Sequence, residues 1–106
     1  ALMLAAENQS KETAKLLLQN GANIEATNKD GATALMLAAE NQSKEAAKLL
    51  LQNGANIEAT NKDGATALML AAENQSKEAA KLLLQNGANI EAKNKDGKTA
   101  EDLASG

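Results

Sequence analysis

The sequence contains no cysteine, histidine, proline or aromatic residue. Without cysteine, disulfide bonds and thiolate metal sites are excluded. Without histidine, a Ser or Thr nucleophile lacks its usual base, and the lysines stand on faces that we expect to be solvated. Carboxylate pairs such as Glu40 and Glu45 occur several times along the chain, but no aromatic residue is present to form a pocket around them. We therefore expect them on a solvated face and not as an acid–base pair. We therefore predict a protein that is not an enzyme and uses no cofactor.

Long apolar runs and a charge excess of one sign are also missing. Runs of the type "ALMLAA" are far shorter than the roughly 20 residues of a membrane-spanning helix, and no signal segment opens the chain. The net charge is −3, with no basic stripe for phosphates and no aromatic ring on which a base could stack. These absences predict a soluble protein, cytoplasmic if it is expressed in a cell, that binds neither nucleic acid nor membranes.

What the chain does have is a 33-residue unit that is repeated almost without change. Residues 1–33 differ from residues 34–66 only at Thr13, which is Ala46 in the second copy, and residues 67–99 form a third copy. Periods of 20 to 50 residues are typical of solenoids, in which each unit buries its apolar face against its neighbours. We predict one domain over residues 1–106, with a partial unit at 100–106.

The second and third copies have the start and stop residues of two helices each. Thr33 is a favourable N-cap before "ALMLAAE", which predicts a first helix from Ala34 to Glu40. Ser43 as N-cap and Gly54 as a left-handed residue past the end predict a second helix over 44–53. Apolar residues recur at helical spacing in both, so the two helices can pack against each other. The Asn-Lys-Asp-Gly cluster that follows predicts a hairpin-like turn.

This unit resembles the ankyrin repeat over the whole chain. The specific parts are "TALM", similar to the Thr-Pro-Leu-His of that family, then "LAA", "LLL" and "NGANIEA". The resemblance implies an all-α solenoid of antiparallel helix pairs joined by projecting β-hairpin-like loops. It also implies a module that binds a protein partner.

The chain departs from the family pattern at several packed positions. Met36 stands where the family has His, and we expect it in the core between repeats. Gln42 replaces a Gly, where positive φ would cost on the order of 1 kcal/mol, so we expect Asn41 to adopt that conformation instead. Ala46 and Ala47 replace larger residues, which removes roughly 0.8 kcal/mol of burial per missing methylene. These departures predict a lean core.

The "NKDG" turn also resembles part of an EF-hand calcium loop. Asn28, Asp30 and Gly31 fit that pattern, but Ala26 occupies the first ligand position and Leu37 the last, where a bidentate Glu is required. Asn and Asp are better explained as turn residues that bond their own backbone. We predict no metal site.

The resemblance places a candidate protein-binding surface on the hairpin tips and on exposed positions of the first helix. Carried over to this chain, its residues are Thr27, Lys29, Asp30, Ala32, Glu40 and Asn41 in one unit, and Thr60, Lys62, Asp63, Ala65, Glu73 and Asn74 in the next. Leu37 and Leu70 either line the same groove or belong to the core, and the sequence leaves both open.

The two sets of candidate residues are identical in type, and no Trp or Tyr can act as an anchor. An evolved partner is irregular, so near-perfect copying indicates a synthetic, consensus-style designed scaffold, for protein binding or structural study. A fragment of a natural array that was recently duplicated is an alternative. The third copy has Lys93 and Lys98 at two positions that the family uses for contact, where the second copy has Thr60 and Ala65. Either the small neutral residues of the inner hairpins suit a partner or lateral self-association, or the lysines increase solubility at the last repeat.

The two ends of the chain suggest a further alternative, self-association. The first copy lacks the N-cap Thr and the hairpin ahead of it, so Leu2, Met3 and Leu4 could stack on another molecule. The neutral hairpins offer a second route. At the other end, Glu101 and Asp102 replace apolar residues, which predicts a truncated C-terminal cap with a polar outer side.

Overall fold

The computed structural model describes residues 11–21 and 23–105, which hold helices and turns but no strand. The helices are α2 (Lys11–Gln19), α3 (Ala34–Glu40), α4 (Lys44–Gln52), α5 (Ala67–Glu73), α6 (Lys77–Gln85) and α7 (Ala100–Ser105). This order confirms the predicted all-α solenoid of helix pairs. The predicted bounds of the first helix, Ala34 to Glu40, are confirmed as well.

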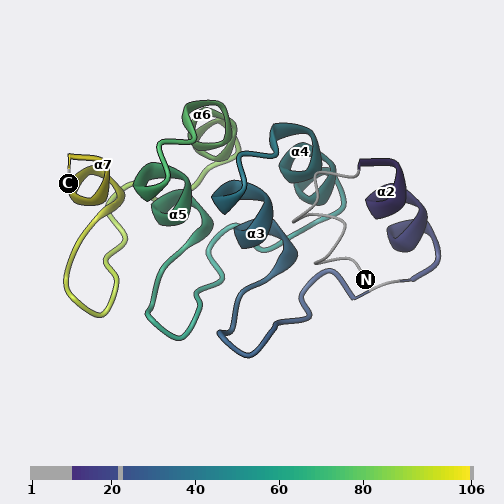
Figure 1. The fold of residues 1–106 in the computed structure, drawn as a ribbon, viewed down its shortest axis with the longest axis horizontal. Coiled ribbons are helices and arrows are strands. Elements are labelled where there is room, and N and C mark those ends of the chain that lie inside the picture. The colour runs from purple at the N-terminus through teal and green to yellow at the C-terminus, as the bar shows by residue number, and fades with distance from the viewer. Residues whose placement is uncertain (1–10, 22, 106) are drawn as a thin grey trace.

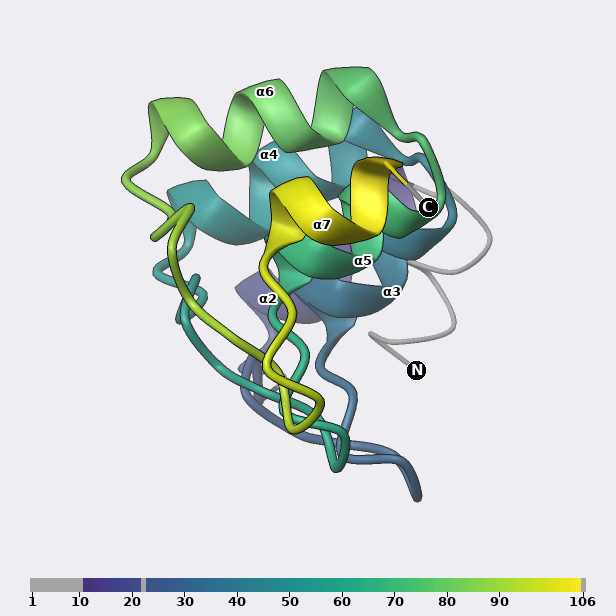
Figure 2. The same cartoon turned by 90° about the vertical axis from the view of Figure 1, so that its left-hand side faces the viewer.

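The helices form two layers (Figure 1). Helices α3, α5 and α7 pack side by side in one layer, and α2, α4 and α6 form the other. The connecting loops project from the same side of the stack, and Figure 2 shows them one behind another when the stack is viewed along its length. The molecule is therefore elongated, with extents of 38 × 25 × 21 Å.

The first helix of each pair begins at a capping threonine. Thr33 has extended backbone angles, φ −91° and ψ 170°, and its Oγ1 accepts a hydrogen bond from the Met36 backbone N–H at 3.4 Å. Thr66 accepts from Met69 in the same way at 3.3 Å. Because these bonds satisfy a backbone donor that the helix leaves unpaired, the predicted N-cap is confirmed.

The first helix ends in a Schellman motif whose left-handed residue is Gln42, not Asn41. The Ser43 N–H donates to Ala38 O at 2.8 Å and the Gln42 N–H donates to Ala39 O at 3.3 Å. This pair of bonds requires positive φ one residue after the C-cap. Asn41 is that C-cap, with φ −93°, so the strained position falls on Gln42, with φ 60°. The expectation for Asn41 was therefore wrong.

The second helix departs from prediction at both ends. It stops at Gln52, one residue earlier than expected, because Asn53 is the C-cap and Gly54 takes the left-handed position with φ 87°. At its start, Ser43 makes no side-chain capping bond. Its ψ is 83°, far from the 170° that lets Thr33 cap the first helix. Ser43 thus occupies the N-cap position without the predicted hydrogen bond.

The core lies between the two layers and between successive repeats. Met36 and Met69 are buried, which confirms the predicted role of methionine there, whereas Met3 lies outside the described residues. Ala46 and Ala47 are fully buried beside Leu50. Small side chains at packed positions let the helices approach closely but contribute little apolar area, as expected of a lean core.

Helix α7 opens with a reciprocal cap. The Thr99 N–H donates to Asp102 Oδ2 at 3.0 Å, and the Asp102 N–H donates to Thr99 Oγ1 at 3.3 Å. The backbone and hydroxyl of Thr99 hold the pKa of Asp102 below its ordinary value. Glu101 and Asp102 are both exposed, so this end of the stack has the expected polar positions. Leu2, Met3 and Leu4 lie outside the described residues.

Candidate functional site

The candidate site is built on the turns that project from the helix layers. In each turn the asparagine side chain holds the backbone. Asn28 Oδ1 accepts from the Asp30 N–H at 2.9 Å and from the Ala32 N–H at 3.0 Å, while the Gly31 N–H donates to Asn28 O at 3.0 Å. Asn28 is therefore committed to the turn, as predicted from "NKDG", and Gly31 supplies the positive φ of 76°.

Neighbouring turns are bonded to one another. The Lys62 N–H donates to Asp30 O at 2.9 Å, and the Lys95 N–H donates to Asp63 O at 3.1 Å. Lys62 Nζ also lies 2.9 Å from Asp30 Oδ1. The hydrogen bond and the negative charge of Asp30 raise the pKa of Lys62 above its ordinary value. The turns are thus fixed as a row, one repeat after the next.

A second set of bonds links the bases of the loops. Glu25 Oε2 accepts from the Asn56 N–H, and Glu58 Oε2 accepts from the Asn89 N–H, both at 2.7 Å. Each carboxylate therefore reaches a backbone donor about one repeat ahead. Because the contact recurs from copy to copy, it holds consecutive loops at a constant offset.

The turns at 61–65 and 94–98 enclose, with helices α5 and α7, a hollow of about 450 Å³. Its apolar lining comes from Met69 and Leu70 of α5 and from Leu103 of α7. Its charged lining has both signs, with Glu73 and Lys98 among the exposed side chains. The remaining lining residues are Asn61, Asp63, Ala65, Asn94, Lys95 and Asp96. Its lining exposes more polar than apolar surface, so the hollow offers amide, carboxylate and ammonium partners around a small apolar floor.

The structure divides the predicted surface residues into two groups. Most are exposed or half-buried: Thr27, Lys29, Asp30, Leu37, Glu40, Asn41, Thr60, Lys62, Asp63, Glu73 and Asn74. Ala32 and Ala65 are only 7% exposed and Leu70 8%, because the base of each turn folds onto the first helix. Ala32 and Ala65 are therefore almost covered, although Ala65 still lines the hollow. Leu37 is half-buried, while Leu70 belongs to the core and reaches the hollow.

The hollow brings together only four of the predicted residues: Asp63, Ala65, Leu70 and Glu73. The candidate set omitted the other wall, which includes Lys95 and Asp96 of the third turn and Leu103 of α7. Lys98, which also lines this wall, was noted only as a changed position in the third copy. The 33-residue period could have predicted the residues of this wall. Lys95 is the counterpart of Lys29 and Lys62, so extending the candidate set by one more repeat would have found it.

The described residues show no gathered groups for metal chemistry. Over residues 11–21 and 23–105, no three His, Cys, Asp or Glu side chains are placed to hold a metal ion. Within the same ranges, no helix combines the length and apolar character needed to cross a membrane. The hollow is lined by exposed carboxylates and ammonium groups and by the amides of Asn61 and Asn94, around a small apolar floor.

Comparison with known proteins agrees with this geometry. A family model described as "Ankyrin repeats (3 copies)" matches residues 2–94 and residues 53–105. A search of curated proteins finds no match. The matched segments together span nearly the whole chain, and the helix pairs and projecting turns are those implied by the resemblance in sequence. Ankyrin repeats are protein–protein interaction modules. The chain belongs to the ankyrin-repeat family.

Proposed function

We propose that this chain binds a segment of another protein in the hollow that the turns at 61–65 and 94–98 form with helices α5 and α7. The observation that supports the proposal is the 450 Å³ hollow itself, which has Met69, Leu70 and Leu103 in its lining. An apolar side chain of the bound segment fills the hollow, because burying it there removes apolar area from water. Lys98 and Glu73 at the rim select the charges that flank that side chain.

A displayed library of random peptides, selected on the immobilised protein, tests this proposal without a known partner. Selected peptides are measured by calorimetry against the wild type and against the variants Glu73→Lys and Lys98→Glu. These residues are exposed, so the variants should fold normally and lose binding about five- to fifty-fold. The matched controls are Glu45→Lys and Lys48→Glu, exposed positions on α4. A selection that yields no peptide, or peptides unaffected by both groove variants, would count against the proposal.

We further propose that the chain is an engineered scaffold with no partner selected for it. The support is the near-identity of the copies, which leaves their exposed turns alike in residue type. A scaffold of this kind predicts selected peptides of unrelated sequence, each bound weakly. A fragment of a natural protein-binding array predicts one recurring motif bound much more tightly than the others. Sequencing the selected pool separates these two origins.

Self-association is a second candidate function, favoured by apolar side chains at the two ends of the stack. Leu16 is 59% exposed near one end, and Leu84 and Ile90 are 43% and 47% exposed near the other. Exposed apolar surface at both ends of a repeat stack favours contact between molecules. The neutral turns with Thr27 and Thr60 offer a lateral alternative. Molar mass measured by light scattering over a wide concentration range tests association, and changing both threonines to Lys tests the lateral route.

A further inference from the structure

The contact between successive repeats can be compared with the outer side of the last described helix pair. Inside the stack, α6 packs against both α4 and α5. Ala47 of α4 is fully buried there, and Leu51 is half-buried. Polar bonds border this contact: Gln42 Nε2 donates to Asn74 O at 3.1 Å, and Lys44 Nζ lies 3.6 Å from Glu78 Oε2. This interface is therefore apolar at its centre and polar at its edge.

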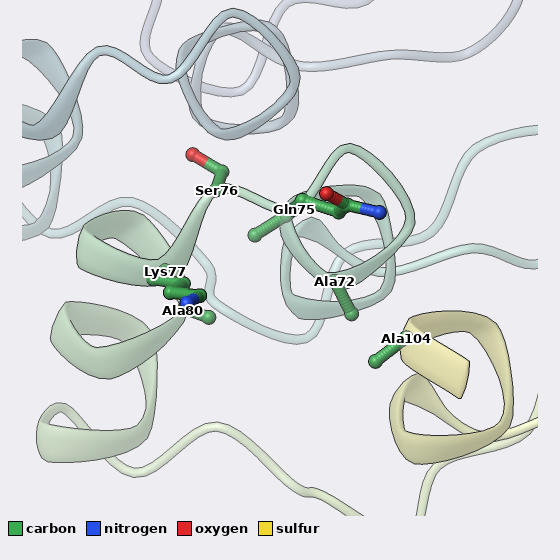
Figure 3. Close-up of a pocket in the computed structure, with 7 residues that line it drawn as sticks. Ala72, Gln75, Ser76, Lys77, Ala80 and Ala104 are labelled. Carbon is green, nitrogen blue, oxygen red and sulfur yellow. The ribbon is translucent and has the colours of Figure 1, made fainter. Parts of the chain in front are cut away.

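The same surface recurs one repeat later, where none of the described helices covers it. Hollows of about 290 Å³ and about 200 Å³ lie side by side between α6, α5 and α7 and share Ala72, Ala80 and Ala104 in their linings. In Figure 3, Ala80 on α6 faces Ala72 and Ala104 across the larger one. Ala80 corresponds to Ala47, and Leu84, which lines the smaller hollow, corresponds to Leu51. The surface around Ala80 and Leu84 is thus the counterpart of the one around Ala47 and Leu51.

The polar groups at the edge of this surface are repeated too. Gln75 and Lys77 line the larger hollow, and they correspond to Gln42 and Lys44, which bond the next repeat. Within the part of the chain that the structure describes, no such bond is formed by Gln75 or Lys77. Only the Lys44 bond reaches α6, because Gln42 bonds Asn74, the C-cap of α5. The apolar floor with Lys77 at its edge is therefore the counterpart of the α4 surface that α6 covers.

The opposite end of the stack presents a helix of that type. Helix α2 differs from α4 and α6 at one residue of nine, Thr13. Its Leu16 is 59% exposed, whereas the equivalent Leu49, inside the stack, is buried. Its exposed Glu12 corresponds to Glu78, the partner of Lys44. Helix α2 therefore exposes a leucine at the place of the buried Leu49 and a glutamate at the place of Glu78, the partner of Lys44.

We propose that α2 of a second copy docks in the groove between α6 and α7, which makes a head-to-tail contact. Leu16 of the second copy lies against Ala80 and Leu84, and its Glu12 lies beside Lys77. The interface continues the α4–α6 contact already present within the chain. This inference rests on self-association, the second candidate function, and names its two faces. Because the two faces differ, the contact repeats from copy to copy and does not close at a dimer.

Two exposed leucines allow each face to be blocked separately. Leu16→Glu blocks the α2 face, and Leu84→Glu blocks the groove, while circular dichroism verifies that each variant is folded. Light scattering of the wild type should show a mass that climbs above 10.9 kDa with concentration. Each variant alone should keep the mass of a single chain. An equimolar mixture should form a complex of one copy of each, because each variant retains the face that the other lacks.

A second pair of variants keeps the test valid if the leucine variants fail to fold. Glu12→Lys and Lys77→Glu are exposed changes, and each should weaken association about two- to five-fold, as expected for an exposed ion pair. Mixing the two variants places the exchanged charges opposite each other again and should recover association. Both measurements use the full chain.

The outcomes separate this inference from the candidate function on which it rests. If the wild type stays at the mass of one chain at every concentration, self-association and the head-to-tail contact both fall. If the wild type associates but the mixture of blocked variants does not, self-association stands and the proposed faces are wrong. The same conclusion holds if the blocked variants associate as strongly as the wild type.

Discussion

Asp30 and Lys62 meet twice, once through the backbone and once through their side chains. The Lys62 N–H donates to Asp30 O at 2.9 Å, and Lys62 Nζ lies 2.9 Å from Asp30 Oδ1. The two residues stand in neighbouring turns, and both side chains are about two-thirds exposed. The backbone bond fixes the spacing of the turns. The ion pair adds a contribution that solvent and salt screen.

Asp30→Asn should lower the melting temperature slightly at low salt and have almost no effect at high salt. Because Asp30 raises the pKa of Lys62 above 10.5 in the folded state, the contribution of this pair is fully present below pH 10.5 and is lost as the pH rises through the folded value. Thermal unfolding of wild type and Asp30→Asn should therefore converge at alkaline pH. If the difference in melting temperature between the wild type and Asp30→Asn changed with neither salt nor pH, the ion pair would be excluded as its cause.

Gly64→Ala should destabilise the chain more than the equivalent change Gly97→Ala. Both glycines have positive φ, 74° and 76°, so both substitutions incur a backbone penalty of about 1 kcal/mol. A Cβ at Gly64 would also lie 3.1 Å from the Lys95 backbone N of the next turn, whereas a Cβ at Gly97 meets nothing within 4 Å. We expect the Gly64 variant to lose on the order of 1 kcal/mol more. Urea unfolding measures the free energy of unfolding of both variants. Equal losses of stability would show that the contact between the new Cβ and the next turn contributes nothing.

Gln75→Gly should stabilise the protein, although it removes a side chain. Gln75 has φ 56° at the end of α5, a conformation that costs a non-glycine residue about 1 kcal/mol. Glycine removes that cost, so we expect a gain of roughly 0.5–1 kcal/mol in the free energy of unfolding. Gln75→Ala keeps the strain and serves as the control, with little change expected. A gain of the same size for alanine would trace the effect to the side chain instead.

Acidification should loosen helix α7 through Asp102. Thr99 holds the pKa of Asp102 below 3.8 by donating its backbone N–H, and the hydroxyl of Thr99 bonds the Asp102 backbone. A lowered folded pKa means that the contribution is present above about pH 3.8 and is lost as the pH falls through the folded value. Asp102→Asn resembles the protonated state. Its stability deficit, measured by thermal unfolding, should therefore be present at pH 7 and vanish near pH 2, and a constant deficit would contradict this account.

The sequence by itself determined the repeat, the helix pairs and their order. These follow from local rules: Thr33 caps the first helix, Gly54 ends the second, and Asn28 bonds its own turn. Each rule acts within a few residues, so a short stretch of sequence is enough to predict where a helix begins, where it ends and where the chain turns. Four residues of the candidate site were also within reach, since the resemblance names the positions that lie on the turns and first helices.

The sequence pattern did not show which residue bears the strain, which the local bonds at the helix end decide, and only the tertiary structure decided which surface is open. Gln42 takes positive φ because the closing bonds of α3, not side-chain preference, set the left-handed position. Ala47 is buried and Ala80 partly open although they occupy the same place in identical helices. The burial of a side chain in a repeat stack depends on the neighbouring repeat. A periodic sequence therefore predicts where each helix forms but not which of its side chains a neighbour covers. For the same reason the hollow, whose walls come from the second copy, the third copy and the partial unit, exists only once the repeats are stacked.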